Sequence, residues 1–112
     1  MTTTISRQEL HEALRVGDVV LLEALPAMHF DAEHLPGAEN LPLDDLDALA
    51  PVLVPDRATP IVTYCTGVTC RNSEIAAARL EALGYTDVRA YKGGKEDWIG
   101  AGLPIEATEA VV

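Results

Sequence analysis

The chain of 112 residues is long enough for one domain with its own core, and its 48% apolar and 23% charged residues exclude a disordered polyelectrolyte. Eighteen Asp and Glu against eight Lys and Arg give a formal net charge of −10, which argues against a general binder of nucleic acid or anionic membranes. A small local anion pocket is compatible with this charge.

The cysteine content and the first residues bear on the compartment. Cys65 and Cys70 are the only cysteines, whereas a secreted disulfide scaffold of this size would carry more, at wider spacings. Residues 1–7 lack the apolar stretch of a signal peptide, and the longest apolar run, Val19–Leu22, is too short to span a bilayer. We therefore expect a cytoplasmic protein with reduced thiols. The spacing of His, Cys and Asp predicts no metal site.

The first predicted element is a helix that begins after Ser6. Ser6 and Glu9 have the spacing of a capping box, and Ile5 and Leu10 have the spacing of a hydrophobic staple. Gly17 stands where a residue in the left-handed conformation would end the helix.

A buried strand and an irregular stretch follow this helix. The apolar run Val19–Ala24, with Glu23 at its end, is typical of a strand covered on both faces. The stretch Leu25–Pro42 is rich in proline and is predicted to be irregular, with a short strand at Ala38–Leu41.

The rest of the chain alternates between helices and strands, which predicts an α/β fold with a parallel central sheet flanked by helices on both faces. Ligands of such sheets bind at the carboxyl ends of the strands. The predicted elements are a helix at Asp44–Leu53, shortened or kinked by Pro51, a strand at Pro60–Tyr64, a helix at Asn72–Leu83, a strand at Val88–Tyr91, a turn at Gly93 and Gly94, and a helix at Glu96–Ala101.

The segment from Cys65 to Ser73 is the candidate site, because it joins a buried strand directly to the clearest helix. The free N–H groups at the start of that helix favour an anion in the loop and lower the pKa of a thiol there, which predicts a nucleophilic thiolate at Cys65. Arg71 adds a charge that can fork two hydrogen bonds to an oxyanion. The predicted anion-binding loop consists of Thr66, Gly67, Val68, Thr69, Cys70 and Arg71.

Each cysteine also has a structural interpretation. Cys65 can be a packing thiol, since free cysteine is among the most buried residue types. Cys70 can resolve a persulfide or sulfenate on Cys65 by forming a disulfide that a thioredoxin-type reductant then opens, or it can pack in the wall of the loop. The disulfide requires Cα atoms within roughly 7 Å of each other.

Several further residues have mainly structural interpretations. His34 is expected to hydrogen-bond the backbone of its loop, and Trp98 to anchor the last helix in the core. Glu23, at the end of a strand, is expected to orient backbone or an arginine. Lys92 and Lys95 flank a Gly-Gly turn, which is interpreted as solvated, with a cationic contribution to the pocket as the alternative.

The order of these motifs resembles that of a single-domain rhodanese over about residues 6–105. The resemblance covers nearly the whole chain, and Glu23 stands where that family often has Asp. The segments that carry the resemblance are Tyr64-Cys65 with its loop and Ser73, Ile75-Ala76-Ala77, Leu80 to Tyr85, Val88 to Gly94 with Trp98, the segment Glu33 to Pro42, and Gly102-Leu103-Pro104-Ile105.

This resemblance implies a single rhodanese-like domain over residues 1–112 with its core at about 6–105. It implies a sulfurtransferase in which Cys65 accepts sulfane sulfur as a persulfide, and in which the loop from Thr66 to Cys70, with Arg71, cradles the anion. The implied partners are a small sulfur-containing anion as donor, a thiol or thioredoxin-type reductant, and a sulfur-acceptor protein. No cofactor is implied.

Two departures from the family keep alternatives open. Cys65 and Arg71 have the spacing Cys-x5-Arg, which is that of dual-specificity phosphatases and arsenate reductases on the same fold. Tyr64 and Asn72, however, differ from the usual phosphatase pattern. Leu25 stands where many rhodaneses have Arg, so the salt bridge of that arginine is not expected. The third interpretation is a non-catalytic module that carries or senses sulfur for a partner protein.

Overall fold

Five parallel strands form one sheet at the centre of the structure, a computed structural model that describes residues 3–108. The strand order is β1-β5-β4-β2-β3, so β4 is the central strand. All the residues of β4 are buried, as expected for a strand covered on both faces. The strands are β1 (Thr3–Thr4), β2 (Val20–Glu23), β3 (Glu39–Asn40), β4 (Ile61–Tyr64) and β5 (Val88–Tyr91).

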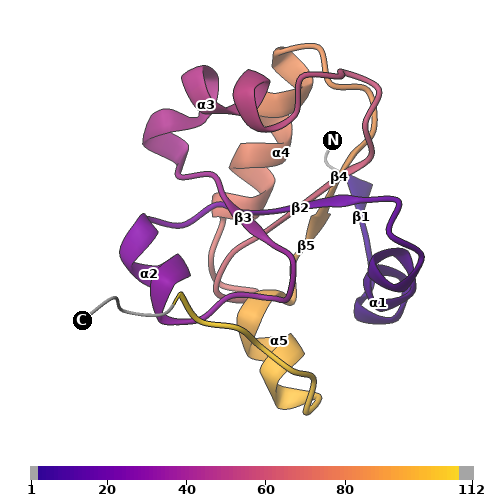
Figure 1. Cartoon of the computed structure of the whole chain (residues 1–112), viewed down its shortest axis with the longest axis vertical. Helices are drawn as coiled ribbons and strands as arrows, with labels where there is room; N and C mark the ends of the chain where they lie inside the picture. The colour runs from indigo at the N-terminus through magenta and orange to yellow at the C-terminus, as the bar shows by residue number, and fades with distance from the viewer. Residues whose placement is uncertain (1–2, 109–112) are drawn as a thin grey trace.

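The helices divide between the two faces of the sheet. Figure 1 shows α3 and α4 on one side of the strands and α1 and α5 on the other. The predicted α/β fold, with a parallel sheet between helices, is therefore confirmed. The helices are α1 (Arg7–Val16), α2 (Ala27–Ala32), α3 (Leu46–Leu53), α4 (Asn72–Ala82) and α5 (Gly94–Gly100), with a 3-10 turn, η1 (Leu43–Asp45), before α3.

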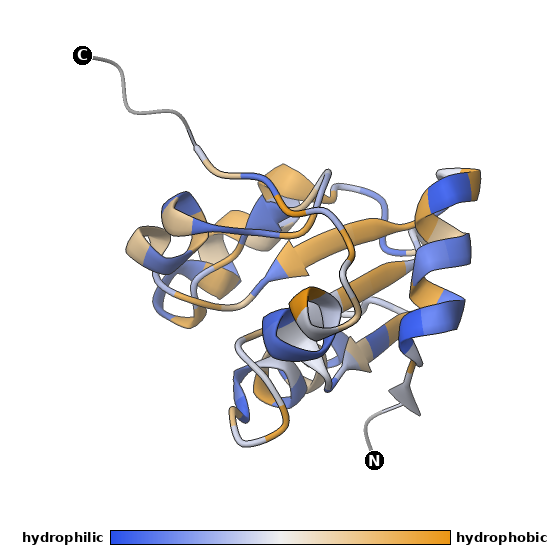
Figure 2. Cartoon of the chain, turned by 90° about the horizontal axis from the view of Figure 1, so that it is seen from below, coloured by the Kyte–Doolittle hydropathy of each residue, from blue (hydrophilic) through white to orange (hydrophobic). Residues whose placement is uncertain are grey.

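Alternating side chains of each strand build a separate core on each face. In β2, Leu22 joins the core beneath α3 and α4, whereas Leu21 joins the core that contains Leu10 of α1 and Trp98 of α5. Figure 2 shows the inner strands as largely hydrophobic and the helices as mixed. The apolar runs without alternation in the sequence thus correspond to strands that bury both faces.

Helix α1 begins and ends at the predicted residues. The Ser6 hydroxyl accepts a hydrogen bond from the Glu9 N–H at 3.1 Å, and the Glu9 carboxylate accepts one from the Ser6 N–H at 3.1 Å. Gly17 has a φ of 86° and ends the helix in the left-handed conformation. The capping box and the glycine stop are therefore both confirmed.

The structure differs from the prediction mainly in short elements. Helix α2 lies in the stretch predicted to be irregular; it has six residues, none of them fully buried, and no side-chain cap, so it lacks an amphipathic signal. The helix predicted at Asp44–Leu53 begins as the 3-10 turn η1 and becomes α-helical at Leu46. Strand β1 is too short to show any periodicity. Among the helices of residues 3–108, none has the length and apolar character needed to cross a membrane.

Candidate functional site

Cys65 lies at the carboxyl end of the central strand β4, as predicted from the sequence. Its side chain is buried, with 1% of its surface exposed, so the sulfur sits beneath the loop and not on the surface. The loop continues to Arg71, which occupies the N-cap position of α4. The geometry therefore places a single buried thiol between the middle of the sheet and the start of a helix.

Two side-chain hydrogen bonds, one from β4 and one from α4, fix the position of the loop ends. The Thr63 hydroxyl donates to the Ser73 carbonyl oxygen at 2.7 Å, which joins β4 to the first turn of α4. The Asn72 amide donates to the Ala24 carbonyl oxygen at 2.9 Å, which joins α4 to the end of β2. Because both bonds come from buried or half-buried side chains, the start of α4 has a fixed position relative to Cys65.

The N-terminal turn of α5 covers the other side of the loop. The Lys95 N–H donates to the Cys65 carbonyl oxygen at 3.0 Å, and the Glu96 N–H donates to the Thr66 carbonyl oxygen at 2.9 Å. Gly94 has a φ of 60°, and a Cβ there would overlap the Cys65 carbonyl oxygen and lie 2.8 Å from the Thr66 carbonyl carbon. This close approach therefore requires glycine at position 94.

The environment of the Cys65 thiol contradicts one prediction. Its Sγ donates a hydrogen bond to the Cys70 carbonyl oxygen at 3.4 Å. Burial and the interaction with the Cys70 side chain raise the pKa of Cys65, and the Ser73 N–H and hydroxyl only partly oppose this. The lowered pKa predicted from the sequence is therefore wrong for this state, because the helix N–H contributes as expected but burial outweighs it.

Cys70 forms the second half of a thiol pair. Its side chain is half-buried, and both cysteines are free. Partial burial opposes ionisation, but the neighbouring Cys65 side chain and the N–H groups of Asn72 and Thr66 outweigh it and lower the pKa of Cys70. Of the two thiols, Cys70 is therefore the more acidic one.

Ser73 is a site residue to which the sequence analysis assigns no role. Its hydroxyl is buried and has no hydrogen-bond partner within residues 3–108. Both the hydroxyl and the N–H of Ser73 favour the ionised form of Cys65. Because hydrogen bonds to an anion are stronger than those to a neutral thiol, we expect this hydroxyl to donate a hydrogen bond to Cys65 when Cys65 is a thiolate. Its position in the first turn of a helix after a cysteine loop is the signal that could have identified it.

The remaining predicted loop residues form the rim of the site. Thr66, Val68, Thr69 and Arg71 are exposed, and Gly67 is buried against the Glu96 carboxylate, which a Cβ at position 67 would overlap. Lys92, at the end of β5, lies 3.7 Å from Glu74 in the first turn of α4. The rim thus carries charges of both signs around a neutral thiol, and Arg71 is at its edge with a solvent-exposed side chain.

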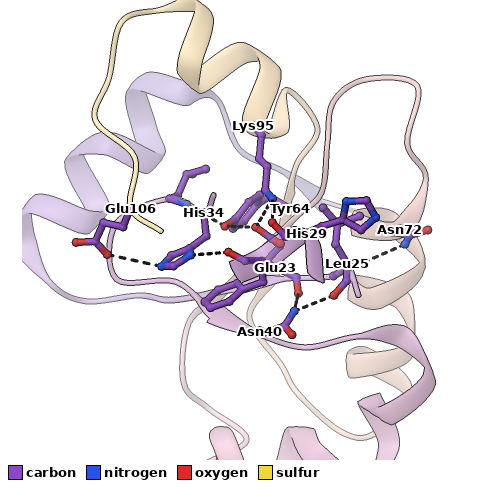
Figure 3. A network of polar contacts seen from close by, with 12 residues as sticks. Glu23, Leu25, His29, His34, Asn40, Tyr64, Asn72, Lys95 and Glu106 are labelled. Atoms are coloured by element: carbon purple, nitrogen blue, oxygen red, sulfur yellow. Dashed lines mark hydrogen bonds and ion pairs between the residues drawn. The ribbon is translucent and has the colours of Figure 1, made fainter. Parts of the chain in front are cut away.

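A buried ion pair lies beside the site and fixes α5 in place (Figure 3). Glu23, fully buried at the end of β2, accepts hydrogen bonds on Oε1 from the Tyr64 hydroxyl at 2.8 Å and from Lys95 Nζ at 3.1 Å. Lys95 Nζ also donates to the His29 carbonyl oxygen at 2.8 Å. Burial raises the pKa of Glu23, against the effect of its hydrogen bonds from Tyr64 and Lys95. Lys95 takes part in this ion pair through its side chain and donates its backbone N–H to the Cys65 carbonyl oxygen, so the ion pair helps to fix the position of the loop.

The predictions for the charged residues are thus partly confirmed and partly wrong. The solvated turn predicted for Lys95 is wrong, because its side chain is only 8% exposed, whereas that of Lys92 is 47% exposed. Glu23 does meet a cation, but the cation is Lys95 from α5 and not an arginine. Leu25, which replaces the expected arginine, is buried.

His34 has the backbone role that the sequence predicted. Its Nδ1 donates to the Phe30 carbonyl oxygen at 2.8 Å, and its ring stacks on that of Phe30 with centroids 3.9 Å apart. Its Nε2 lies 3.9 Å from the Glu106 carboxylate (Figure 3). Within residues 3–108, no three His, Cys, Asp or Glu side chains are grouped to hold a metal ion.

Comparisons with known proteins relate this chain to proteins of one domain family. Residues 6–101 match the sequence model of a family described as the Rhodanese-like domain. The HTH-type transcriptional regulator Rv0324 of Mycobacterium tuberculosis is 33% identical over 102 residues, covering 91% of this chain and 44% of that protein. The adenylyltransferase and sulfurtransferase UBA4 of Meyerozyma guilliermondii is 28% identical over 95 residues, covering 79% of this chain and 22% of that protein.

One solved structure shows the same fold over nearly the whole chain. A thiosulfate sulfurtransferase from Pseudomonas aeruginosa superposes with a TM-score of 0.85 at 24% identity, covering 99% of this chain and 22% of that chain. This likeness concerns the fold alone. The chain spans less than half the length of the two curated relatives, at 44% and 22%.

Proposed function

We propose that this chain, which belongs to the rhodanese-like domain family, is a sulfurtransferase that carries sulfane sulfur as a persulfide on Cys65. The observation that carries the proposal is the position of this buried thiol, at the carboxyl end of β4 and directly before the loop that leads into α4. The name of UBA4, a sulfurtransferase, supports the same activity.

The first half-reaction is a displacement at a sulfane sulfur, with thiosulfate as the simplest donor. Cys65 loses its proton to solvent and becomes a thiolate. The thiolate attacks the outer sulfur of thiosulfate, the sulfur–sulfur bond of thiosulfate breaks, and sulfite leaves with the electron pair. The product is a Cys65 persulfide anion, which the N–H and hydroxyl of Ser73 stabilise, while Arg71 supplies a cation for the leaving sulfite.

The second half-reaction returns the thiolate. A thiophilic acceptor, such as cyanide or an external thiol, attacks the terminal sulfur of the persulfide, and Cys65 leaves as a thiolate. Val68 and Thr69 are exposed residues of the loop that covers Cys65. The buried position of Cys65 then favours a small acceptor or a narrow thiol-bearing segment over a folded surface.

A second candidate function, a sulfur-carrying or sulfur-sensing module, is favoured by one observation. The relative Rv0324 is a transcriptional regulator, and this chain covers 44% of it. A sensor would use the same first half-reaction and would keep the persulfide without turnover. The two candidates therefore differ in the second half-reaction.

Sulfur transfer from thiosulfate to cyanide, measured as thiocyanate, tests the proposal. Wild type is expected to turn over, and Cys65→Ser is expected to lose the activity while retaining its urea unfolding transition. Parallel assays with an aryl phosphate, and with arsenate plus a thiol, examine the Cys-x5-Arg alternative. Hydrolysis of the phosphate or reduction of arsenate through Cys65 without thiocyanate would overturn the proposal. Uptake of sulfur without thiocyanate would favour the sensing module.

A further inference from the structure

We infer that Cys70 resolves the persulfide on Cys65, so that the protein releases hydrogen sulfide, closes a Cys65–Cys70 disulfide and uses a dithiol as its final reductant. The inference rests on the proposed function, because it begins from the persulfide on Cys65. It adds a reductive activity to a sulfurtransferase site.

The loop folds Cys70 back over Cys65. The Cys70 N–H donates to the Gly67 carbonyl oxygen at 3.0 Å, which turns the chain within the loop. The Cys65 Sγ then lies 3.4 Å from the Cys70 carbonyl oxygen. The two thiols also influence each other, since the neighbouring Cys65 side chain lowers the pKa of Cys70. The turn therefore places Cys70 against the sulfur of Cys65.

The surroundings suit Cys70 to the role of nucleophile. The N–H groups of Asn72 and Thr66 favour its thiolate, and its pKa is lowered although the side chain is half-buried. The start of α4 adds the positive end of a helix. The more acidic sulfur of the pair is thus the one that lies outside, where it can be ionised while Cys65 carries the persulfide.

The resolving step balances without an outside oxidant. The persulfide anion on Cys65 first takes up a proton from solvent. The Cys70 thiolate then attacks Sγ of Cys65, the bond between Sγ and the terminal sulfur breaks, and the terminal sulfur leaves as hydrosulfide with the electron pair. The two cysteine thiols are oxidised to a disulfide, and the sulfane sulfur is reduced to sulfide. With thiosulfate as donor, sulfite and hydrogen sulfide are both products.

A dithiol completes the cycle, and the exposure of the two cysteines decides where it acts. Cys65 is buried beneath the loop, whereas Cys70 is half-buried at the rim. An external thiolate therefore attacks the sulfur of Cys70, which gives a mixed disulfide and frees Cys65. The second thiol of the reductant then resolves the mixed disulfide and frees Cys70. A thioredoxin-type dithiol has this chemistry.

A single-turnover experiment tests the inference with no added reductant. The reduced chain is freed of thiol and treated with an equimolar amount of thiosulfate, and sulfite, sulfide and intact mass are followed together. Wild type is expected to release both sulfite and sulfide, and peptide mapping is expected to find a disulfide between Cys65 and Cys70. Cys70→Ser and Cys70→Ala are expected to release sulfite, keep the added sulfur on Cys65, and release sulfide at least about tenfold more slowly, because the intramolecular nucleophile is lost.

The outcomes separate the inference from the proposed function. Sulfite release with an equally stable persulfide in wild type and in Cys70→Ser would overturn the inference and leave the sulfurtransferase standing. A disulfide between two chains in place of one within the chain would also overturn it. No sulfite and no gain of sulfur in any of the proteins would mean that the proposed function itself fails. The mapping of wild type does not depend on the folding of either variant.

Discussion

Replacing Lys95 by Met is expected to lower the free energy of unfolding by about 3–5 kcal/mol, because it leaves a carboxylate buried without its cation. Glu23 is fully buried, the Lys95 side chain is 8% exposed, and the two charged groups are 3.1 Å apart. At an effective dielectric constant of about 20, charges at this distance attract by about 5 kcal/mol, which agrees with that range. Methionine keeps most of the aliphatic stem, so the loss reports the charge and not a cavity.

Urea unfolding of four proteins measures this effect, and Lys92→Met is the matched control. Lys92 is the other lysine of the chain, is 47% exposed and lies 3.7 Å from Glu74, so its replacement is expected to change the unfolding free energy by less than about 1 kcal/mol. Glu23→Gln combined with Lys95→Met is expected to recover most of the loss, because the amide still accepts a hydrogen bond from Tyr64 without burying a charge.

The pH dependence of the Lys95→Met deficit provides a second check. Burial holds the pKa of Glu23 above its ordinary value, so in the variant the folded state binds more protons than the unfolded state between the unfolded and folded pKa values. The deficit is therefore expected to shrink as the pH falls through the folded pKa. Equal losses for Lys95→Met and Lys92→Met, or a double variant no more stable than Lys95→Met, would refute this account of the ion pair.

Three further predictions concern the loop. Gly94→Ala is expected to destabilise the protein by at least about 1 kcal/mol more than Gly102→Ala in urea unfolding, because both positions have a positive φ but only at Gly94 does a Cβ meet backbone; equal losses would contradict this. Ser73→Ala is expected to move the alkylation profile of Cys65 to higher pH with little loss of stability, and an unmoved profile would count against its role. In wild type, the rate of Cys65 alkylation is expected to increase only at a pH above the ordinary thiol range, because the pKa of Cys65 is raised. Cys70→Ala is expected to move this pH profile to lower pH, because the Cys70 side chain contributes to the raised pKa. A shift to higher pH would refute the interaction between the two thiols.

Much of the fold could be predicted because its signals are local. Ser6, Glu9 and Gly17 determine the ends of α1 through contacts within a few residues of one another. The strands β2 and β4 are recognisable because they bury both faces and are mostly apolar, with no alternation of polar and apolar residues. Helix α2 carries no such signal, because no residue of it is fully buried and Pro26 provides no side-chain cap.

The candidate site could be located from the sequence, but its electrostatics could not. The position of Cys65 follows from the order of strand, loop and helix. The direction of its pKa shift depends on burial and on the approach of Cys70, and both arise only when the loop has folded and α5 has packed against it. The hydroxyl of Ser73 likewise acquires its significance from being enclosed without a partner.

The burial of Lys95 could not be predicted from the sequence either, because its partners come from distant parts of the chain. A lysine beside two glycines has the pattern of a solvated turn. The parallel sheet places the end of β2, and with it Glu23, beneath the start of α5, and Tyr64 of β4 supplies the second donor. The strand register aligns Glu23 with Tyr64, and the packing of α5 brings Lys95 to Glu23.

The most direct test of the central claim is the mass of the Cys70→Ser protein after treatment with thiosulfate. In this variant Cys65 is the only thiol, so any persulfide must be on it. We expect the reduced protein to gain one sulfur atom, to lose it again to cyanide as thiocyanate, and to gain none when Cys65 is also replaced by Ser. A folded Cys70→Ser protein that gains no sulfur from thiosulfate or from a small persulfide donor would contradict the claim that Cys65 carries sulfane sulfur.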